Sequence, residues 1–368
     1  SRGLGDVYKR QVLVGMADSI MIASVGEAAV SGVSLVDQIM VLLINAFSAL
    51  ATGGAVVAGQ FLGQDRREEA CKSATQMVWF ITICAIGITV LVYLGKSFIL
   101  HTVFGKIDQD VMHHADIYLL IVAASIPFMA LYNGGAAIFR TMGNSKVTMQ
   151  ISIIMNVINI GGNAILIYGF HRGTEGVAIP TLVSRMTAAI IIIALLCDEK
   201  RTLHIERTWR YRINWEMVKK ILSIGVPNGL ENSMFQLGKL AIQSTVSTLG
   251  TTAIAAQAMT NILENLNGMA AIGVGVGLMT IVGQCMGADR KDEAVYYIKK
   301  LSVIAEVAII VSCLLVFALT RPVTALGGME PASAKMCFHM VTWITLVKPI
   351  VWTLAFVPAY GLRAAGDV

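Results

Sequence analysis

The chain has 368 residues, of which 56% are hydrophobic and only 14% are charged, and its mean hydropathy is +0.70. This composition excludes an ordinary soluble protein, which would carry far more charged surface at this length. The net charge is +5, and the basic residues lie in short loops between apolar runs. They therefore indicate membrane topology and argue against nucleic-acid binding. The six cysteines show no Cys-x-x-Cys spacing, which argues against a disulfide framework or a metal site.

Apolar runs of about 20 residues recur along the chain and are the signature of membrane-spanning helices. Residues 1–10 do not resemble their counterpart in the repeat described below, and we expect them to be a non-native tail. A short helix is expected within residues 96–105. The longer helices, about ten transmembrane segments in all, are predicted at residues 11–25, 28–62, 66–94, 109–142, 146–170, 175–197, 215–249, 252–286, 289–319 and 331–366. The expected fold class is therefore an all-α polytopic membrane protein.

One twelve-residue stretch occurs twice, 224 residues apart. Residues 59–70 read GQFLGQDRREEA and residues 283–294 read GQCMGADRKDEA, with seven of the twelve positions identical. The same register pairs Gly26 with Gly250 and Gly53 with Gly277. The chain is therefore a duplicated unit. Six helices per repeat give two lobes of the same orientation, related by an axis along the membrane normal.

The duplication predicts an N-terminal six-helix lobe at residues 11–198, a cytoplasmic linker at residues 199–214 and a C-terminal lobe at residues 215–368. The second lobe is expected to stop after its fourth helix, without counterparts of the last two helices of the first lobe. Lys and Arg number sixteen in one set of alternating loops and five in the other. The positive-inside rule places the richer set, which includes residues 59–70 and 283–294, in the cytoplasm.

Several short motifs resemble, in their order and spacing, the multidrug and toxic compound extrusion (MATE) family. They cover nearly everything after Gln11 and comprise Met16-Ala-Asp18, the paired Gly-Gln-x-x-Gly stretches, Arg140-x-x-Gly-Asn144, Asn159 with Asn163, Gly176-Val-Ala-Ile-Pro-Thr181 and Gly225-Val-Pro-Asn-Gly-Leu-Glu231. The resemblance implies a pair of six-helix lobes that export amphipathic, often cationic, compounds against an inward flow of Na⁺ or H⁺.

Polar residues inside predicted spans form the first candidate site. Asp18 lies in the first helix, and Thr181 lies in the sixth. Asn159 and Asn163 are four residues apart, so they share one face of the fifth helix. Carboxylate, amide and hydroxyl oxygens suit a hard cation or a proton, and the resemblance implies that these four residues surround a cation-coupling site in the N-terminal lobe. The alternative is that they only hydrogen-bond neighbouring helices.

Charged residues also fall within predicted spans of the C-terminal lobe, where they are costly. The resemblance gives Glu231 a cavity or coupling role, but this chain has Trp352 where some members carry an Asp in the tenth helix. Lys239 and Lys348 offer a structural alternative, because either can neutralise Glu231. We expect such pairing, since an unpaired lysine costs roughly 2.5–3.5 kcal/mol at mid-membrane. Arg185, in the sixth helix, is expected to pack against a carbonyl.

The leading hypothesis is a secondary active transporter that exports amphipathic or cationic drugs or metabolites by Na⁺ or H⁺ antiport. The alternative is a lipid-linked precursor flippase or polysaccharide exporter of the same superfamily. An enzyme is not expected, because Gly-x-Ser-x-Gly and His-Glu-x-x-His motifs are absent. We expect a monomer in the plasma membrane that contacts lipid and a small-molecule substrate. It should use no cofactor beyond the coupling ion, hold no metal beyond Na⁺ at the N-terminal site, and bind no nucleic acid.

Overall fold

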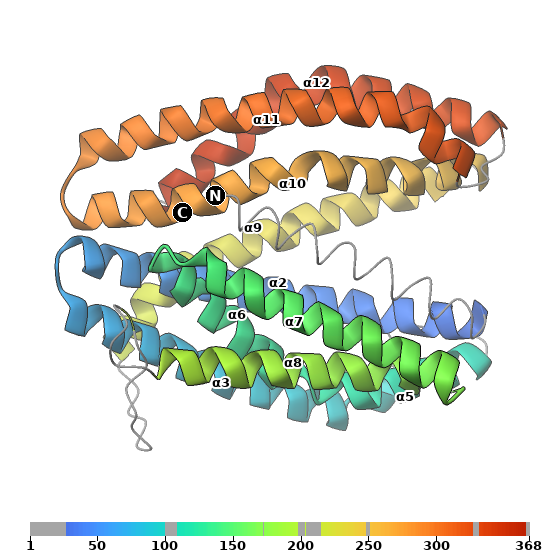
Figure 1. Cartoon of the computed structure of the whole chain (residues 1–368), viewed down its shortest axis with the longest axis horizontal. Helices are drawn as coiled ribbons and strands as arrows, with labels where there is room; N and C mark the ends of the chain where they lie inside the picture. The colour runs from blue at the N-terminus through green and yellow to red at the C-terminus, as the bar shows by residue number, and fades with distance from the viewer. Residues whose placement is uncertain are drawn as a thin grey trace. The chain divides into compact units, whose positions relative to one another are not determined.

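The computed structural model describes residues 27–99, 109–171, 173–197, 203, 215–247, 251–326 and 331–365. Long helices joined by short turns make up nearly all of these residues (Figure 1). The chain forms two compact units, and the division falls inside one helix, between Gly229 and Leu230. The expected first helix and residues 1–10, including the expected tail, lie outside the described residues. In both units the described residues form helices joined by turns, as the sequence predicted.

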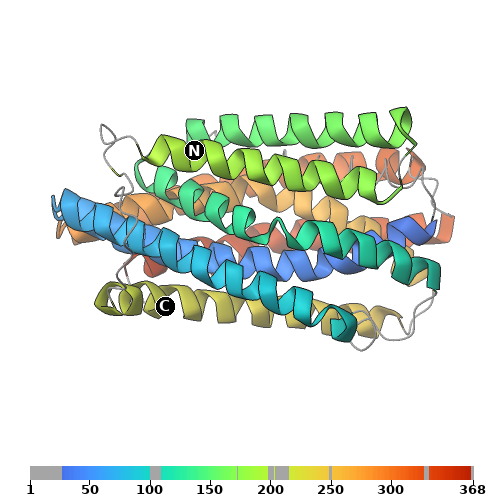
Figure 2. The same ribbon diagram turned by 90° about the horizontal axis from the view of Figure 1, so that it is seen from below.

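The first unit is built around one long helix, α2, which packs against α3, α5 and α6, while α8 packs against α5, α6 and α7. Figure 2 shows these helices running along the same axis. Their bounds are α2 (Glu27–Gly63), α3 (Arg67–Leu94), α4 (Lys96–Phe98), α5 (Gln109–Ala123), α6 (Ile126–Thr141), α7 (Ser145–Ala164), the π-helix η2 (Ile165–Gly169) and α8 (Glu175–Leu196), followed by the first half of α9 (Trp215–Ser247).

The prediction of one continuous helix at residues 109–142 is wrong in one respect. The structure has two helices in this segment, and the first ends at Ala123. The helix direction changes by 51° between the two parts, α5 and α6. Pro127 lies in the first turn of α6, where its missing N–H costs nothing but prevents a continuous hydrogen-bond ladder. Ser125, buried at the break, donates its hydroxyl to the Val122 carbonyl at 2.6 Å. The break therefore places a buried hydroxyl in the middle of a membrane segment.

The second unit contains the rest of α9 together with three mutually packed helices, α10 (Thr251–Gly287), α11 (Lys291–Leu326) and α12 (Pro331–Ala364). In the first unit, α2 packs against α3 and α6, which pack against each other, so the same order of contacts occurs twice. This agreement is what the 224-residue repeat predicts.

The repeated Gly-Gln-x-x-Gly stretches form the same helix-ending turn in both units. Asp65 and Asp289 adopt left-handed φ angles of 59° and 60°. In the first turn the Arg66 N–H donates to the Phe61 carbonyl at 2.9 Å, and in the second the Arg290 N–H donates to the Cys285 carbonyl at 2.9 Å. This is the Schellman arrangement that closes helix C-termini. The repeated motif is therefore a helix-closing turn in both units.

The described helices have the apolar exteriors of membrane segments. Six of them are long and apolar enough to cross a membrane, or seven if the bent pair α5–α6 counts as one span, among the residues searched. Large apolar side chains are exposed on these helices; Leu91 is 68% exposed and Leu314 is 67% exposed. Such side chains face lipid without penalty in a membrane, whereas contiguous apolar faces of this kind are uncommon on soluble monomers. The chain is a multi-pass membrane protein.

The first half of α9 belongs to the N-terminal unit by its contacts, so the division falls later than the predicted linker at residues 199–214. Gly53 of α2 and Gly225 of α9 explain why these two helices pack closely. A Cβ on Gly53 of α2 would lie 2.4 Å from the Ile221 carbonyl oxygen and 3.0 Å from the Gly225 nitrogen. Only glycines allow two helix backbones to approach so closely.

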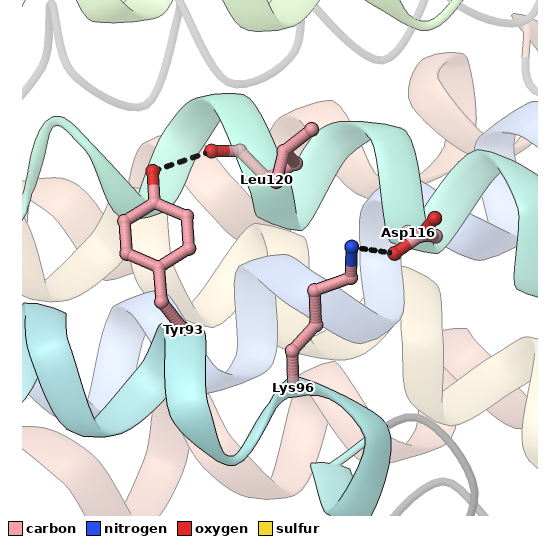
Figure 3. Close-up of polar contacts among 4 residues, drawn as sticks. All are labelled: Tyr93, Lys96, Asp116 and Leu120. Atoms are coloured by element: carbon pink, nitrogen blue, oxygen red, sulfur yellow. Dashed lines mark hydrogen bonds and ion pairs between the residues drawn. The ribbon is translucent and has the colours of Figure 1, made fainter.

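Polar contacts at one end of α3 tie this helix to α5 (Figure 3). The Tyr93 hydroxyl donates to the Leu120 carbonyl at 2.7 Å, and the Lys96 ammonium lies 2.6 Å from an Asp116 carboxylate oxygen. The lysine and aspartate side chains are 28% and 39% exposed, so solvent weakens the ion pair. These contacts hold the C-terminal end of α3 against α5. None of the four residues belongs to the predicted cation site.

Candidate functional site

The candidate cation site lies beside a close contact between α7 and α8. A Cβ on Gly162 of α7 would lie 2.8 Å from the Pro180 Cβ of α8. The next residue on each helix is a predicted site residue, Asn163 on α7 and Thr181 on α8. Asn159 precedes Asn163 by one helical turn on the same face. The helix contact therefore brings the two candidate segments together, although they are separated in the sequence by a loop.

All three side chains are buried, with exposures of 8% for Asn159, 0% for Asn163 and 6% for Thr181. The Thr181 hydroxyl donates to the Val177 carbonyl at 2.9 Å, which leaves its oxygen lone pairs available as acceptors. The Asn159 side-chain oxygen has no hydrogen-bond donor among the described residues. A buried acceptor without a donor costs roughly 1–3 kcal/mol, and a bound cation or the hydrogen of a protonated group would satisfy it. Asp18, the predicted carboxylate of this site, lies outside the described residues.

The backbone around these residues departs from regular α-helix. α7 continues into the π-helix η2 directly after Ala164, and π-segments within helices occur frequently at functional sites. Pro180 lies inside α8, so the carbonyl of Gly176 receives no helical hydrogen bond from position 180. In membrane proteins, carbonyls freed in this way can coordinate Na⁺ or H⁺. The sequence indicated the proline but not the π-helix.

A second polar cluster joins α2, α5 and α8 in the same unit. The Tyr118 hydroxyl donates to an Asp37 carboxylate oxygen at 2.8 Å. Arg185 donates from Nη1 to the Ser125 hydroxyl at 2.7 Å and interacts electrostatically with Asp37. Arg185 follows Thr181 by one turn of α8, so this cluster begins beside the candidate cation site. Arg185 was expected to pack against a carbonyl; one of its hydrogen bonds goes to the Ser125 hydroxyl at the α5–α6 break.

Sequence reasoning missed Asp37 as a candidate. Its charge inside a long apolar run was the available signal, since intramembrane carboxylates mark functional positions by default. Its partners come from helices that follow much later in the sequence, so no local pattern indicated them.

In the second unit, Glu231 forms an ion pair with Arg363 of α12. The Glu231 side chain is 51% exposed and the Arg363 side chain is 9% exposed. The expectation that Lys239 or Lys348 neutralises Glu231 is wrong. The carboxylate of Glu231 pairs with Arg363, and neither lysine lies within ion-pair distance of it. Arg363 lies near the end of the helix predicted at residues 331–366, and the sequence gave no reason to pair it with Glu231.

Lys348 is buried, at 7% exposure, and donates to the Glu264 carbonyl at 3.4 Å. Its ammonium also lies 5.5 Å from the centre of the Trp352 ring. Lys239 is exposed, and its ammonium lies 4.9 Å from the centre of the Phe235 ring. Neither lysine has a carboxylate within ion-pair distance among the described residues. Aromatic faces stabilise both ammonium groups.

Long apolar helices in two units, with buried polar side chains at helix contacts, define a polytopic membrane protein. A family model described as MatE matches residues 10–165 and 227–368. The chain belongs to the MatE family, whose members are transporters and not enzymes, and the protein is a multi-pass protein of the plasma membrane.

Curated relatives of similar sequence are bacterial. The chain is 25% identical to the uncharacterized transporter YisQ of Bacillus subtilis, over 77% of this chain and 62% of that protein. It is 24% identical to the probable multidrug resistance protein NorM of Thermotoga maritima, over 87% of this chain and 69% of that protein. The chain thus spans less than two thirds of the length of YisQ.

Solved structures share the fold. An outward-facing multidrug resistance MATE family transporter of the MOP superfamily matches with a TM-score of 0.90 and 17% identity, over 99% of this chain and 81% of that one. A MOP superfamily transporter from Pyrococcus furiosus, whose binding pocket is described as having reversed polarity, matches with a TM-score of 0.85 and 19% identity, over the same shares. At these identities the likeness establishes the fold alone.

Proposed function

We propose that the complete protein is a secondary active transporter that exports amphipathic small molecules, driven by an inward flow of Na⁺ or H⁺. The observation that carries this proposal is the α7–α8 contact, where the amides of Asn159 and Asn163 and the hydroxyl of Thr181 are buried beside irregular backbone. Buried polar groups in membrane segments are costly, and they persist where a pathway or coupling ion uses them.

The residues present suit a small hard cation or a proton. The uncompensated Asn159 oxygen, the Thr181 hydroxyl oxygen and the carbonyl released by Pro180 are neutral oxygen ligands, and Asp18 would supply the negative charge. In this proposal the ion binds between α7 and α8 and so stabilises one arrangement of these helices. A ligand shifts a conformational equilibrium only by its differential affinity for the two states, so ion binding and substrate release become linked.

The charge of the substrate is a separate question. The expectation of a cationic substrate came from the family resemblance and required Glu231 to neutralise a lysine, and Glu231 pairs with Arg363 instead. The Pyrococcus furiosus relative, with its pocket of reversed polarity, suggests that side chains, and not the fold, set the preferred charge. The flippase alternative gains support from two lysines without carboxylate partners, but only Arg185, Lys239 and Lys348 lie well inside the predicted spans, too few for a phosphate-lined cavity.

The test is transport by the full-length protein in proteoliposomes loaded with a fluorescent amphipathic compound. Three conditions are compared: an imposed Na⁺ gradient, an imposed pH gradient, and neither. We expect export against a concentration gradient under at least one ion gradient and simple equilibration without it. Export that is independent of both gradients would remove the proposed coupling.

A further inference from the structure

One face of the second unit combines positive charge with aromatic rings. Successive turns of α9 carry Glu231, Phe235 and Lys239, spaced four residues apart and therefore on one side of the helix. On α12 the residues Lys348, Trp352 and Phe356 have the same spacing. Contacts connect the two rows: the Phe235 and Phe356 rings are 5.8 Å apart and nearly perpendicular, and Glu231 pairs with Arg363. We call this arrangement the α9–α12 ladder, and it comprises Glu231, Phe235, Lys239, Lys348, Trp352, Phe356 and Arg363.

The ladder has a neutral end and a positive end. At the neutral end the Glu231 carboxylate and the Arg363 guanidinium compensate each other. At the other end Lys239 and Lys348 carry like charges that act unfavourably on each other. The carboxylate of Glu264 acts electrostatically on Lys348 and offsets part of this charge. Three cations and two carboxylates therefore leave one positive charge, and the exposed Lys239 is the side chain that carries it.

An apolar aromatic surface lies between the two ends. The Trp352 and Phe356 rings have centres 5.0 Å apart and are tilted by 31°, and Phe235 completes the group while remaining 47% exposed. Aromatic rings pack favourably on such surfaces at centroid distances of about 4.5–7 Å. A planar ring of a ligand can therefore pack here while its charged group reaches the lysines.

The exposure of Lys239 indicates contact with water or a ligand. An ammonium facing hydrocarbon costs several kcal/mol, and intramembrane lysines therefore pair or face a water-filled space. Among the described residues Lys239 has only the Phe235 ring as partner. We propose that the α9–α12 ladder binds an aromatic organic anion, with Lys239 as the residue that contacts the anionic group. This proposal rests on the transport function above and names the substrate class of that transporter.

The experiment uses two probes with the same ring and opposite permanent charge, 2-naphthalenesulfonate and 2-naphthyltrimethylammonium. Binding to the purified full-length protein is measured by equilibrium dialysis with naphthalene fluorescence as the readout. We expect the sulfonate to bind more tightly than the ammonium probe. Lys239→Gln should weaken sulfonate binding by about tenfold or more, the usual effect of losing a charged hydrogen bond. Lys239→Arg should retain binding to within about threefold, because it keeps the charge.

Lys299→Gln is the matched control, because it removes an exposed lysine of α11 that is not part of the ladder; it should bind both probes as the unmodified protein does. All variants are compared only after equal elution in size-exclusion chromatography. Tighter binding of the ammonium probe, or unchanged sulfonate binding by Lys239→Gln, would overturn the proposal. Octyl phosphate, an anion without a ring, should compete weakly; equal competition would overturn the aromatic preference and point to a lipid-like phosphate.

The same preparation separates this inference from the proposed function. Gradient-driven export of the amphipathic compound without sulfonate binding refutes the aromatic-anion assignment and leaves the transporter intact. Sulfonate binding that depends on Lys239, without gradient-driven export of any compound, supports the site and refutes ion-coupled transport.

Discussion

Two intramembrane carboxylates in this protein have defined and different partners. Asp37 accepts from the Tyr118 hydroxyl at 2.8 Å in the first unit, whereas Glu231 pairs with Arg363 in the second. The first is a hydrogen bond within a network that continues through Arg185 to Ser125. The second joins a half-exposed group to a buried one. Removing the Asp37 carboxylate and removing the Glu231 carboxylate should therefore affect stability differently.

For the first pair, Asp37→Asn, Tyr118→Phe and the double variant form a cycle. We expect each single substitution to lower the free energy of unfolding and the double variant to lose less than the sum, with a coupling energy of about 1 kcal/mol. Thermal unfolding of the detergent-solubilised variants measures the change in stability of each, from which the coupling energy follows. Additive effects would show that the hydroxyl and the carboxylate do not interact.

For the second pair, Glu231→Gln leaves the Arg363 guanidinium, 9% exposed, without its carboxylate. We expect a loss of about 1 kcal/mol, a modest value because solvent screens the half-exposed glutamate. Glu231→Gln combined with Arg363→Met should recover part of this loss, since replacing both members of a buried pair removes the stranded charge. A double variant less stable than Glu231→Gln in the same unfolding assay would contradict this interpretation.

At the scale of helices, adjacent glycines of α7 offer a matched comparison. A Cβ on Gly162 meets Pro180 at 2.8 Å, whereas a Cβ on Gly161 meets nothing within 4 Å. Gly162→Ala should separate α7 from α8 beside Asn163 and reduce ion-coupled export severalfold. Gly161→Ala should leave transport unchanged and add up to about 1 kcal/mol of stability, because alanine favours helix. Equal transport by the two variants would mean that the helix contact does not position the site.

The two helix-ending turns allow a test of the duplication. Asp65 and Asp289 have almost the same left-handed φ, a conformation that glycine adopts at no steric cost. Asp65→Gly and Asp289→Gly should each raise the free energy of unfolding by about 0.5–1 kcal/mol, whereas the corresponding alanine substitutions should not. Opposite signs at the two positions in chemical denaturation would show that the turns are not equivalent.

Local signals were sufficient to predict most helices. Apolar runs predicted the long helices of both units, and the 224-residue repeat predicted that the two units are built alike. The break at Ser125 and the π-helix after Ala164 were not predicted, because each depends on how neighbouring helices pack. A proline near the break, Pro127, is also compatible with a continuous kinked helix, so residue type alone did not decide between the two.

At the scale of the molecule, the sequence indicated which polar residues are costly but not their partners. The four-residue spacing put Asn159 and Asn163 on one helix face, and Thr181 is brought near them by the α7–α8 contact. The partner of Glu231 was predicted to be a lysine and is Arg363. Charge and spacing restrict a side chain to a face, but partners from distant helices depend on tertiary packing.

In the proposed mechanism the cation site of the N-terminal unit couples an ion gradient to export. The most direct measurement compares gradient-driven export with gradient-free exchange in proteoliposomes for the unmodified full-length protein and for Asp18→Asn. Asp116→Asn is the control, because it removes a carboxylate that pairs with Lys96 away from this site. We predict that Asp18→Asn abolishes gradient-driven export and retains exchange, while the control keeps both. Full gradient-driven export by Asp18→Asn would contradict the claim.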